Sequence, residues 1–188
     1  MAVVVGVILG AGSSRRLGQP KQALPLGDTT LLGWVVREAE ASSLDRVVVV
    51  ARDGVATGRA TVALPDAGDG TCSASLRSGL AKAGPCDAVL LLLGDMPGVD
   101  ASVIDAVRAA WESKRPWAVV TRYDEGLGHP LVFSSEALPA LRALHGDKAV
   151  WKLLESEPGR VAEARVARPL PRDVDSWEDY EAVLQAYG

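Results

Sequence analysis

Residues 3–21, VVVGVILGAGSSRRLGQPK, join a continuous apolar segment to a loop rich in glycine, serine and basic side chains. Val3 to Leu9 are apolar at successive positions, which predicts a strand buried on both faces of a parallel sheet. Gly10 and Gly12 follow directly and let the backbone approach a ligand closely. The loop also supplies serine hydroxyls, two arginines and Lys21. The stretch therefore predicts an anion site, and phosphates are the anions we expect there.

The composition is that of an ordinary globular protein. The 188 residues are 48% hydrophobic and 23% charged, with a net charge of −4. A chain of this length fits one domain, residues 1–188, with a core that needs neither disulfide nor metal. An acidic chain without a basic run has no electrostatic footprint for nucleic acid. No apolar run approaches the roughly 18 residues needed to span a membrane.

The amino-terminal residues and the cysteines indicate the compartment. The apolar start lacks a basic first segment and a cleavage site, so it is predicted to be a strand and not a signal peptide. Cys72 and Cys86 suit a reducing environment, and together with the two histidines they give no zinc spacing. We therefore expect a cytoplasmic protein that binds neither nucleic acid nor membrane.

Segments typical of strands alternate with segments of helical spacing along the chain. Strands are predicted at 3–9, 47–51, 61–64, 88–93, 117–121, 131–133 and 161–166. Helices are predicted at 31–39, 76–83, 102–111, 136–144, 148–154 and 177–186, and residues 122–130 are predicted to be a loop. The expected caps are Thr29 or Thr30, Ser73 or Ser75, Ser102 and Ser176. This alternation predicts an α/β fold, a three-layer αβα sandwich around a mostly parallel, Rossmann-like sheet.

Asp95 follows the most apolar run of the chain. Ala88 to Leu93 end abruptly in Gly94-Asp95-Met96-Pro97. A carboxylate at the carboxyl end of a central strand lies where open α/β sheets bind ligands. Asp95 taken alone is a plausible turn residue before proline, but the glycine loop after the first strand favours a functional role. Residues 65–75, PDAGDGTCSAS, form a second candidate for a loop that faces the ligand.

Two common phosphate loops can be tested against the opening stretch. The P-loop is excluded because no Gly-Lys pair followed by Ser or Thr occurs in the chain. The dinucleotide fingerprint is matched in its first half only. Arg15 stands at the place of its third glycine, where a bulky side chain would disturb the packing of helix on strand.

The full string LGAGSSRRLGQPK, followed by LPLGDTTLL, resembles the signature L-A-A-G-x-S-x-R-M-G-x-x-K of nucleotidyltransferases that act on the molybdenum cofactor and of their sugar-nucleotide relatives. The departures are mild: Gly10 for alanine, Leu17 for methionine and Ser176 for threonine. Four further blocks resemble family motifs in family order, at 66–80 (ending S-L-R-x-G-L), 94–97 (G-D-M-P), 128–130 (G-H-P) and 173–180 (D-x-D-T-x-x-D). The resemblance implies the nucleotide-diphospho-sugar transferase type of fold.

Ala11 resembles the residue of the cytidylyl-transferring branch, where the guanylyl-transferring branch has glycine. A methyl group that projects toward the base would narrow its slot and favour a pyrimidine. The resemblance thus implies a nucleotidyltransferase that moves CMP from CTP to molybdopterin, or the molybdenum cofactor, and releases pyrophosphate. Two alternatives stay open. One is a guanylyl or sugar-phosphate nucleotidyltransferase on the same scaffold, and the other is a non-catalytic chaperone that inserts the cofactor into a molybdoenzyme partner.

The resemblance also implies roles for individual residues. Arg16 and Lys21 would neutralise phosphate charge, and Asp95 would bind Mg²⁺ together with Asp173 or Asp175. The catalytic residues are then Arg16, Lys21 and Asp95. The nucleotide would contact Leu9, Gly10, Ala11, Gly12, Ser13, Arg16, Lys21, Asp66, Ser73, Ser75 and Asp95. The acceptor would contact Arg77, His129, Asp173 and Asp175. Taken singly, Asp173 and Asp175 fit equally well as residues that introduce the last helix.

Overall fold

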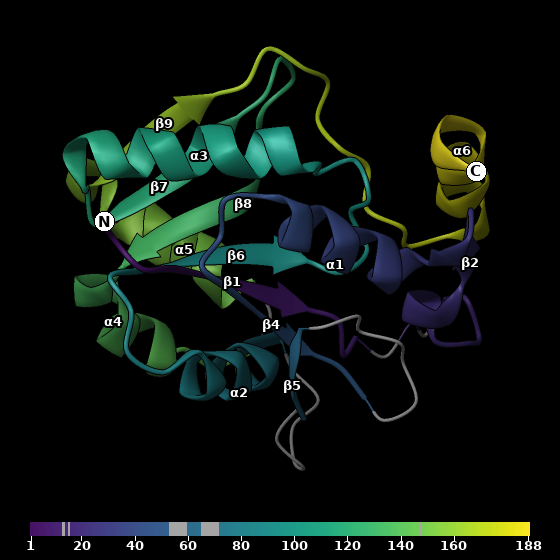
Figure 1. The fold of residues 1–188 in the computed structure, drawn as a ribbon, viewed down its shortest axis with the longest axis horizontal. Helices are drawn as coiled ribbons and strands as arrows, with labels where there is room; N and C mark the ends of the chain where they lie inside the picture. The colour runs from purple at the N-terminus through teal and green to yellow at the C-terminus, as the bar shows by residue number, and fades with distance from the viewer. Residues whose placement is uncertain (13, 15, 53–59, 65–71, 147) are drawn as a thin grey trace.

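A computed structural model describes residues 1–12, 14, 16–52, 60–64, 72–146 and 148–188. Within these residues, seven strands form one sheet in the order β5-β4-β1-β6-β8-β7-β9 (Figure 1). Every neighbouring pair is parallel except the two that involve β8. The strands are β1 (Val4–Leu9), β4 (Arg46–Val50), β5 (Thr61–Ala63), β6 (Ala88–Leu93), β7 (Ala118–Arg122), β8 (Leu127–Ser134) and β9 (Val161–Arg165). The predicted mostly parallel sheet is confirmed.

Helices cover both faces of this sheet, as Figure 1 shows. One apolar cluster joins the sheet to α1 (Leu31–Ala41) and α3 (Ala101–Lys114). A second cluster on the opposite face joins it to α2 (Cys72–Ala83), α4 (Leu138–Arg142) and α5 (Ala149–Ser156). Three short 3-10 turns are η1 (Lys21–Ala23), η2 (Ser135–Ala137) and η3 (Pro158–Arg160). The predicted three-layer α/β sandwich is confirmed.

The carboxyl-terminal segment forms a third cluster of its own. Helix α6 (Trp177–Tyr187) packs against the small hairpin of β2 (Pro25–Leu26) and β3 (Thr29–Thr30) and against the loop after β1. The Tyr180 hydroxyl donates to the carbonyl of Pro25 at 2.6 Å. The Val174 amide donates to the carbonyl of Asp95 at 3.1 Å, so the segment before α6 passes beside the end of β6. The segment before α6 therefore reaches the carboxyl end of a central strand, while α6 itself lies beside the β2–β3 hairpin (Figure 1).

Helix caps decide several of the element boundaries. Thr30 caps α1, and Ser176 with Asp179 forms the expected capping box of α6. Two cap predictions are wrong. Asp100, and not Ser102, accepts the hydrogen bond of the first turn of α3. Helix α2 begins at Cys72, so Ser73 and Ser75 lie inside it and do not cap it.

The predicted loop at residues 122–130 is also wrong. Strand β7 includes Arg122, and β8 begins at Leu127, so a short turn joins two antiparallel strands. The predicted helix at 136–144 is likewise divided into η2 and α4. Among the described residues, no helix has both the length and the apolar character needed to cross a membrane.

Gly94 lies where β6 leaves the sheet, and its lack of a side chain permits a close backbone approach. Its amide donates to the carbonyl of Leu9 at 2.9 Å. A Cβ on Gly94 would lie 3.1 Å from both the Leu9 oxygen and the Gly10 Cα, and 2.7 Å from Leu32. Since backbone atoms cannot give way easily, Gly94→Ala is expected to lower the free energy of unfolding by about 2 kcal/mol.

Urea unfolding followed by circular dichroism measures this change. Gly126→Ala is the matched control, because a Cβ there meets no atom within 4 Å. Equal stability of the two variants would show that β1 and β6 do not need the close contact at their ends.

Candidate active site

The carboxyl ends of β1 and β6 lie side by side at one edge of the sheet. Leu9 pairs with Leu93, and the bonding continues one step further, from the Gly94 amide to the Leu9 carbonyl. The loop after β1 and the carboxylate of Asp95 therefore emerge at the same place. This is the crevice outside the strand ends where open α/β sheets hold ligands.

The loop after β1 is closed on itself by side-chain hydrogen bonds. Ser14 adopts a left-handed backbone with a φ of 48°, and its hydroxyl accepts the Lys21 amide at 2.9 Å. Gln22 donates to the carbonyl of Gly12 at 3.2 Å and is buried. Gln22 cannot be identified from the sequence, because a glutamine outside a motif gives no signal. These bonds fix the start of η1 and hence the direction of Lys21.

Lys21 joins the opening loop to two carboxylates from distant parts of the chain. Its Nζ lies 2.5 Å from Asp95 Oδ2 and 2.8 Å from Asp175 Oδ1. The side chains of Lys21 and Asp95 are only 11% and 17% exposed, while that of Asp175 is 48% exposed. Arg16, on the exposed loop, reaches Asp175 at 3.7 Å. The structure therefore brings four residues of the predicted site into one cluster: Arg16, Lys21, Asp95 and Asp175.

The charges of this cluster depend on one another. Burial raises the pKa of the Asp95 carboxyl, and Lys21 opposes that rise. Burial alone would lower the pKa of the Lys21 ammonium, but the charges and hydrogen bonds of Asp95 and Asp175 outweigh it and raise the pKa. The ammonium is therefore the positive charge that makes a buried carboxylate at Asp95 tolerable.

Asp173 lies on the exposed side of the segment that precedes α6. It and Asp175 are exposed and flank the buried Val174, the alternation expected of an extended segment. The negative charge of Asp173 contributes to the raised pKa of Asp95. All three aspartates of the predicted metal site therefore face the same edge of the sheet.

The donor atoms of this cluster suit a hard cation. The Lys21 ammonium lies between Asp95 and Asp175 and contacts one oxygen of each carboxylate, so a cation would bind through the other carboxylate oxygens or replace these contacts. Oxygen ligands of this kind are preferred by Mg²⁺ and related ions, which usually take one or two carboxylates and complete their shell with water or substrate phosphates. No preformed group of three or more metal-binding side chains occurs among the described residues, which leaves the remaining positions to such ligands.

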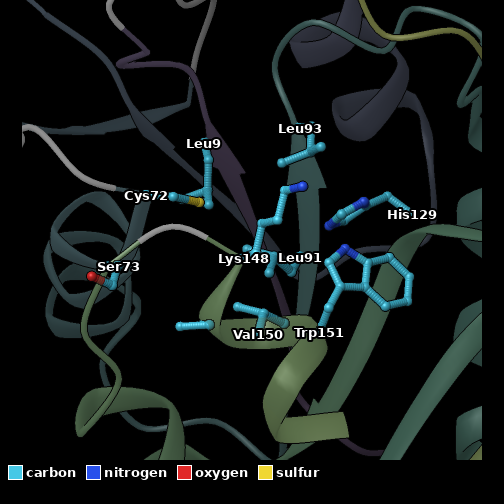
Figure 2. Close-up of a pocket in the computed structure, with 11 residues that line it drawn as sticks. Leu9, Cys72, Ser73, Leu91, Leu93, His129, Lys148, Val150 and Trp151 are labelled. Carbon is cyan, nitrogen blue, oxygen red and sulfur yellow. The ribbon is translucent and has the colours of Figure 1, made fainter. Parts of the chain in front are cut away.

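A largely apolar cavity of about 180 Å³ opens beside this cluster, between the ends of β1 and β6 and the start of α5 (Figure 2). It brings together three predicted site residues, Leu9, Ser73 and His129. The described residues that line it are Leu9, Cys72, Ser73, Leu91, Leu93, His129, Gly146, Lys148, Ala149, Val150 and Trp151. The size and the lining suit part of a small organic molecule.

His129 reaches the cavity because β8 runs antiparallel to β6. Leu131 pairs with Leu91, and continuing this register places His129 beside Leu93 at the ligand-binding edge. His129 is 8% exposed, and its ring packs edge-to-face with that of Trp151, at 5.7 Å between centroids. Burial lowers the pKa of His129 to about 4, so the imidazole is neutral near pH 7.

Acidification is expected to destabilise the protein through His129. The histidine pKa is 6.5 in the unfolded chain and about 4 in the folded one, so the unfolded state binds more protons between these values. The free energy of unfolding is therefore highest, as far as His129 is concerned, above pH 6.5. It falls as the pH is lowered, by about 3 kcal/mol at pH 4. Urea unfolding between pH 7 and pH 4 measures it.

The variant His129→Gln is expected to lose less stability than the wild type over this range, because glutamine does not titrate. His145→Gln replaces an exposed histidine and serves as the control, with the wild-type slope. Identical slopes for all three proteins would contradict a buried neutral imidazole.

Other predicted site residues lie outside these two groups. Arg77, in α2, donates to the carbonyl of Leu144 at 2.9 Å and does not line the cavity. Ser75 is buried within α2. Ala11 is 5% exposed and packs in the apolar cluster on the α2 side of the sheet. That its methyl group narrows the slot for the base stays a prediction. Ser13 and Asp66 lie outside the described residues.

Comparison with known proteins agrees with this arrangement. A family model for the MobA-like NTP transferase domain matches residues 6–163, which include the opening loop, Asp95 and His129. The purine catabolism protein PucB of Bacillus subtilis (strain 168) is 33% identical over 204 residues, covering 97% of each chain. These similarities, with the sheet order, confirm the nucleotidyltransferase type of fold.

Two solved structures from mycobacteria are similar over nearly the whole chain. The Rv0371c homologue from Mycobacterium sp. strain JC1 is 41% identical, with a TM-score of 0.88, covering 97% of this chain and 96% of that one. Rv0371c from Mycobacterium tuberculosis H37Rv, solved in complex with manganese, is 35% identical, with a TM-score of 0.83, covering 98% of this chain and 99% of that one.

Proposed function

Since the chain belongs to the MobA-like NTP transferase family, we propose that it transfers CMP from CTP to a molybdopterin-type acceptor and releases pyrophosphate. The observation that carries the proposal is the Lys21 ammonium, held by Asp95 and Asp175 directly beside the glycine loop. A buried lysine held by Asp95 after β6 and by Asp175 before α6 is more than a surface ion pair. Lys21 provides positive charge, and the two aspartates provide oxygen ligands, which are the groups that phosphoryl transfer requires.

The reaction needs no strong base in this site. The attacking group is the terminal phosphate of the acceptor, which is already an anion, so the protein has to bring two negative groups together in line. The backbone from Leu9 to Gly12 approaches the triphosphate closely. Arg16 lies on the exposed loop with its side chain 78% exposed, from which it can reach the leaving β- and γ-phosphates. Lys21 contacts the phosphates as a point charge.

A divalent cation completes the proposed site. The relative from Mycobacterium tuberculosis was solved with manganese, and the acidic residues described above have the oxygen donors that such an ion prefers. We propose that Asp95, with Asp175 or Asp173, holds Mg²⁺. When bound, the ion would neutralise charge on the triphosphate and favour departure of pyrophosphate.

The apolar cavity is the proposed place of the acceptor ring. It lies next to the end of β6, so a ring held there keeps its substituents near Asp95. Trp151 supplies an aromatic edge, and the neutral His129 offers a hydrogen bond without a charge. These properties suit a flat, uncharged heterocycle such as a pterin.

The choice of CTP rests on Ala11 and the family motifs around it. The test is pyrophosphate release with each of the four nucleoside triphosphates, with Mg²⁺ and with or without molybdopterin. We expect release with CTP only, and only when molybdopterin is present. Release with GTP would identify a guanylyltransferase, release that needs a sugar phosphate would identify a different acceptor, and tight molybdopterin binding without nucleotide consumption would identify a carrier.

A further inference from the structure

Lys148 carries the positive charge of the apolar cavity. It is the one lysine or arginine among the described residues that line this space. Figure 2 shows its side chain extending from the start of α5 across the cavity toward Leu93 and His129. The cavity therefore joins a hydrophobic wall to a single ammonium group, although nothing in the sequence singled out this lysine.

The backbone at Lys148 adopts an unusual conformation at the start of α5. Lys148 occupies the N-cap of α5 in the left-handed conformation, with a φ of 57°. A non-glycine residue in this region carries a conformational cost that the surrounding structure has to offset. No side chain caps the first turn of α5, whose residues Ala149 and Val150 also line the cavity. The uncapped amides of this turn add a partial positive charge.

No described acidic side chain forms an ion pair with the Lys148 ammonium, in contrast to Lys21. The ammonium extends toward Leu93, two residues before Asp95 on the same strand end. It thus lies on the side of the cavity formed by the end of β6, the strand that leads to Asp95. An anionic substituent of a molecule bound in the cavity would meet it on the way to Asp95.

His129 points into the same cavity and offers its polar ring to a ligand bound there. The residue is only 8% exposed, so its ring faces the cavity more than open solvent. A neutral imidazole nitrogen can donate or accept a hydrogen bond with a bound molecule. The imidazole is neutral, so it cannot balance an anion, and that task is left to Lys148.

We propose that Lys148 binds the phosphate group of the acceptor while the acceptor ring lies against His129 and Trp151. The proposal rests on the proposed function, because it takes the acceptor to be a phosphorylated heterocycle. Lys148 would then position the attacking phosphate beside Asp95 and help to select acceptors that carry it. The phosphate oxygens and the ammonium form a charge-assisted hydrogen bond, of the stronger class.

The test compares the binding of molybdopterin and of its dephosphorylated form, by anaerobic titration calorimetry without nucleotide. Lys148→Met is expected to weaken the binding of molybdopterin by roughly 10- to 100-fold, the loss of one charged hydrogen bond. It should leave the binding of the dephosphorylated form and of CTP unchanged. Lys148→Arg is expected to keep the preference for the phosphorylated form. Lys152→Met, an exposed lysine one turn further along α5, is the matched control.

Three outcomes would overturn the inference. The variant could keep the preference for the phosphorylated form, it could bind both forms equally less well, or the wild type could show no preference. If CMP transfer by the wild type is normal in any of these cases, only the role of Lys148 fails. If the wild type binds neither form and transfers no CMP to molybdopterin, the proposed acceptor fails and the inference fails with it.

Discussion

Asp95→Asn is expected to reduce CTP-dependent pyrophosphate release by roughly 100- to 1,000-fold, the loss typical of removing one preorganised electrostatic group from an active site. Asparagine has almost the same shape as aspartate, so the turn after β6 and the hydrogen bond from Val174 to the backbone at 95 are retained. What is lost is the charge that holds Lys21 and that is proposed to bind the cation. The effect should therefore appear in kcat and in the dependence of the rate on Mg²⁺.

The control for this variant is Asp87→Asn. Asp87 immediately precedes β6, at the opposite end of the strand from Asp95, and its carboxylate accepts the Val3 amide at 2.7 Å. Its replacement alters the same strand without touching the proposed site, so we expect normal turnover. Near-normal turnover in Asp95→Asn, with the fold intact by circular dichroism, would contradict the role of Asp95.

Lys21→Met is expected to lose both activity and stability. The ammonium is the partner of a nearly buried carboxylate, and removing one partner of such a pair leaves an uncompensated charge. We expect a loss of about 3 kcal/mol in the free energy of unfolding near pH 7. The loss should grow as the pH rises above the unfolded pKa of aspartate, because burial raises the pKa of Asp95 and the folded state resists its ionisation.

A double variant separates the two effects of Lys21. Lys21→Met combined with Asp95→Asn removes both charges, so most of the lost stability is expected to return while pyrophosphate release stays at background. Lys82→Met, at an exposed position near the end of α2, is the control for the loss of one lysine. Wild-type stability in Lys21→Met alone, measured by urea unfolding, would show that the ion pairs contribute little.

The parts of the fold with strong local signals could be predicted from the sequence. Strands β1 and β6 are continuous apolar runs, and both lie at the centre of the sheet, buried on two sides. The cap of α6 was predicted because a serine followed three residues later by an acidic residue completes a capping box. In these places local preference and tertiary packing agree.

The parts of the fold that depend on contacts between distant residues could not be predicted from the sequence. Residues 127–130, LGHP, contain glycine and proline, which are typical of a loop, yet they extend β8 because Leu127 and Gly128 pair with the end of β7. The cap of α3 was assigned to Ser102 because it fits a capping-box spacing with Asp105, whereas Asp100 is the residue that accepts from Val103. Both Asp100 and Ser102 are suitable N-cap residues, so the sequence pattern alone does not decide which of them caps α3.

The site was predicted in the same uneven way. Arg16, Lys21, Asp95 and Asp175 stand at fixed places in the family strings, and the structure brings these four residues together. Lys148 and Gln22 stand outside any motif, and only the fold brings them to the ligand-binding edge. Their roles depend on where helix α5 and turn η1 begin, which local sequence does not specify.

The central claim is that this chain transfers a cytidylyl group to a molybdopterin phosphate. The most direct measurement is the mass of the product after incubation with CTP, Mg²⁺ and molybdopterin. We expect the mass of molybdopterin to increase by one CMP, with one pyrophosphate released for each adduct, and we expect no adduct with Asp95→Asn. Unmodified molybdopterin with intact CTP, or an adduct formed only with another nucleoside triphosphate, would contradict it.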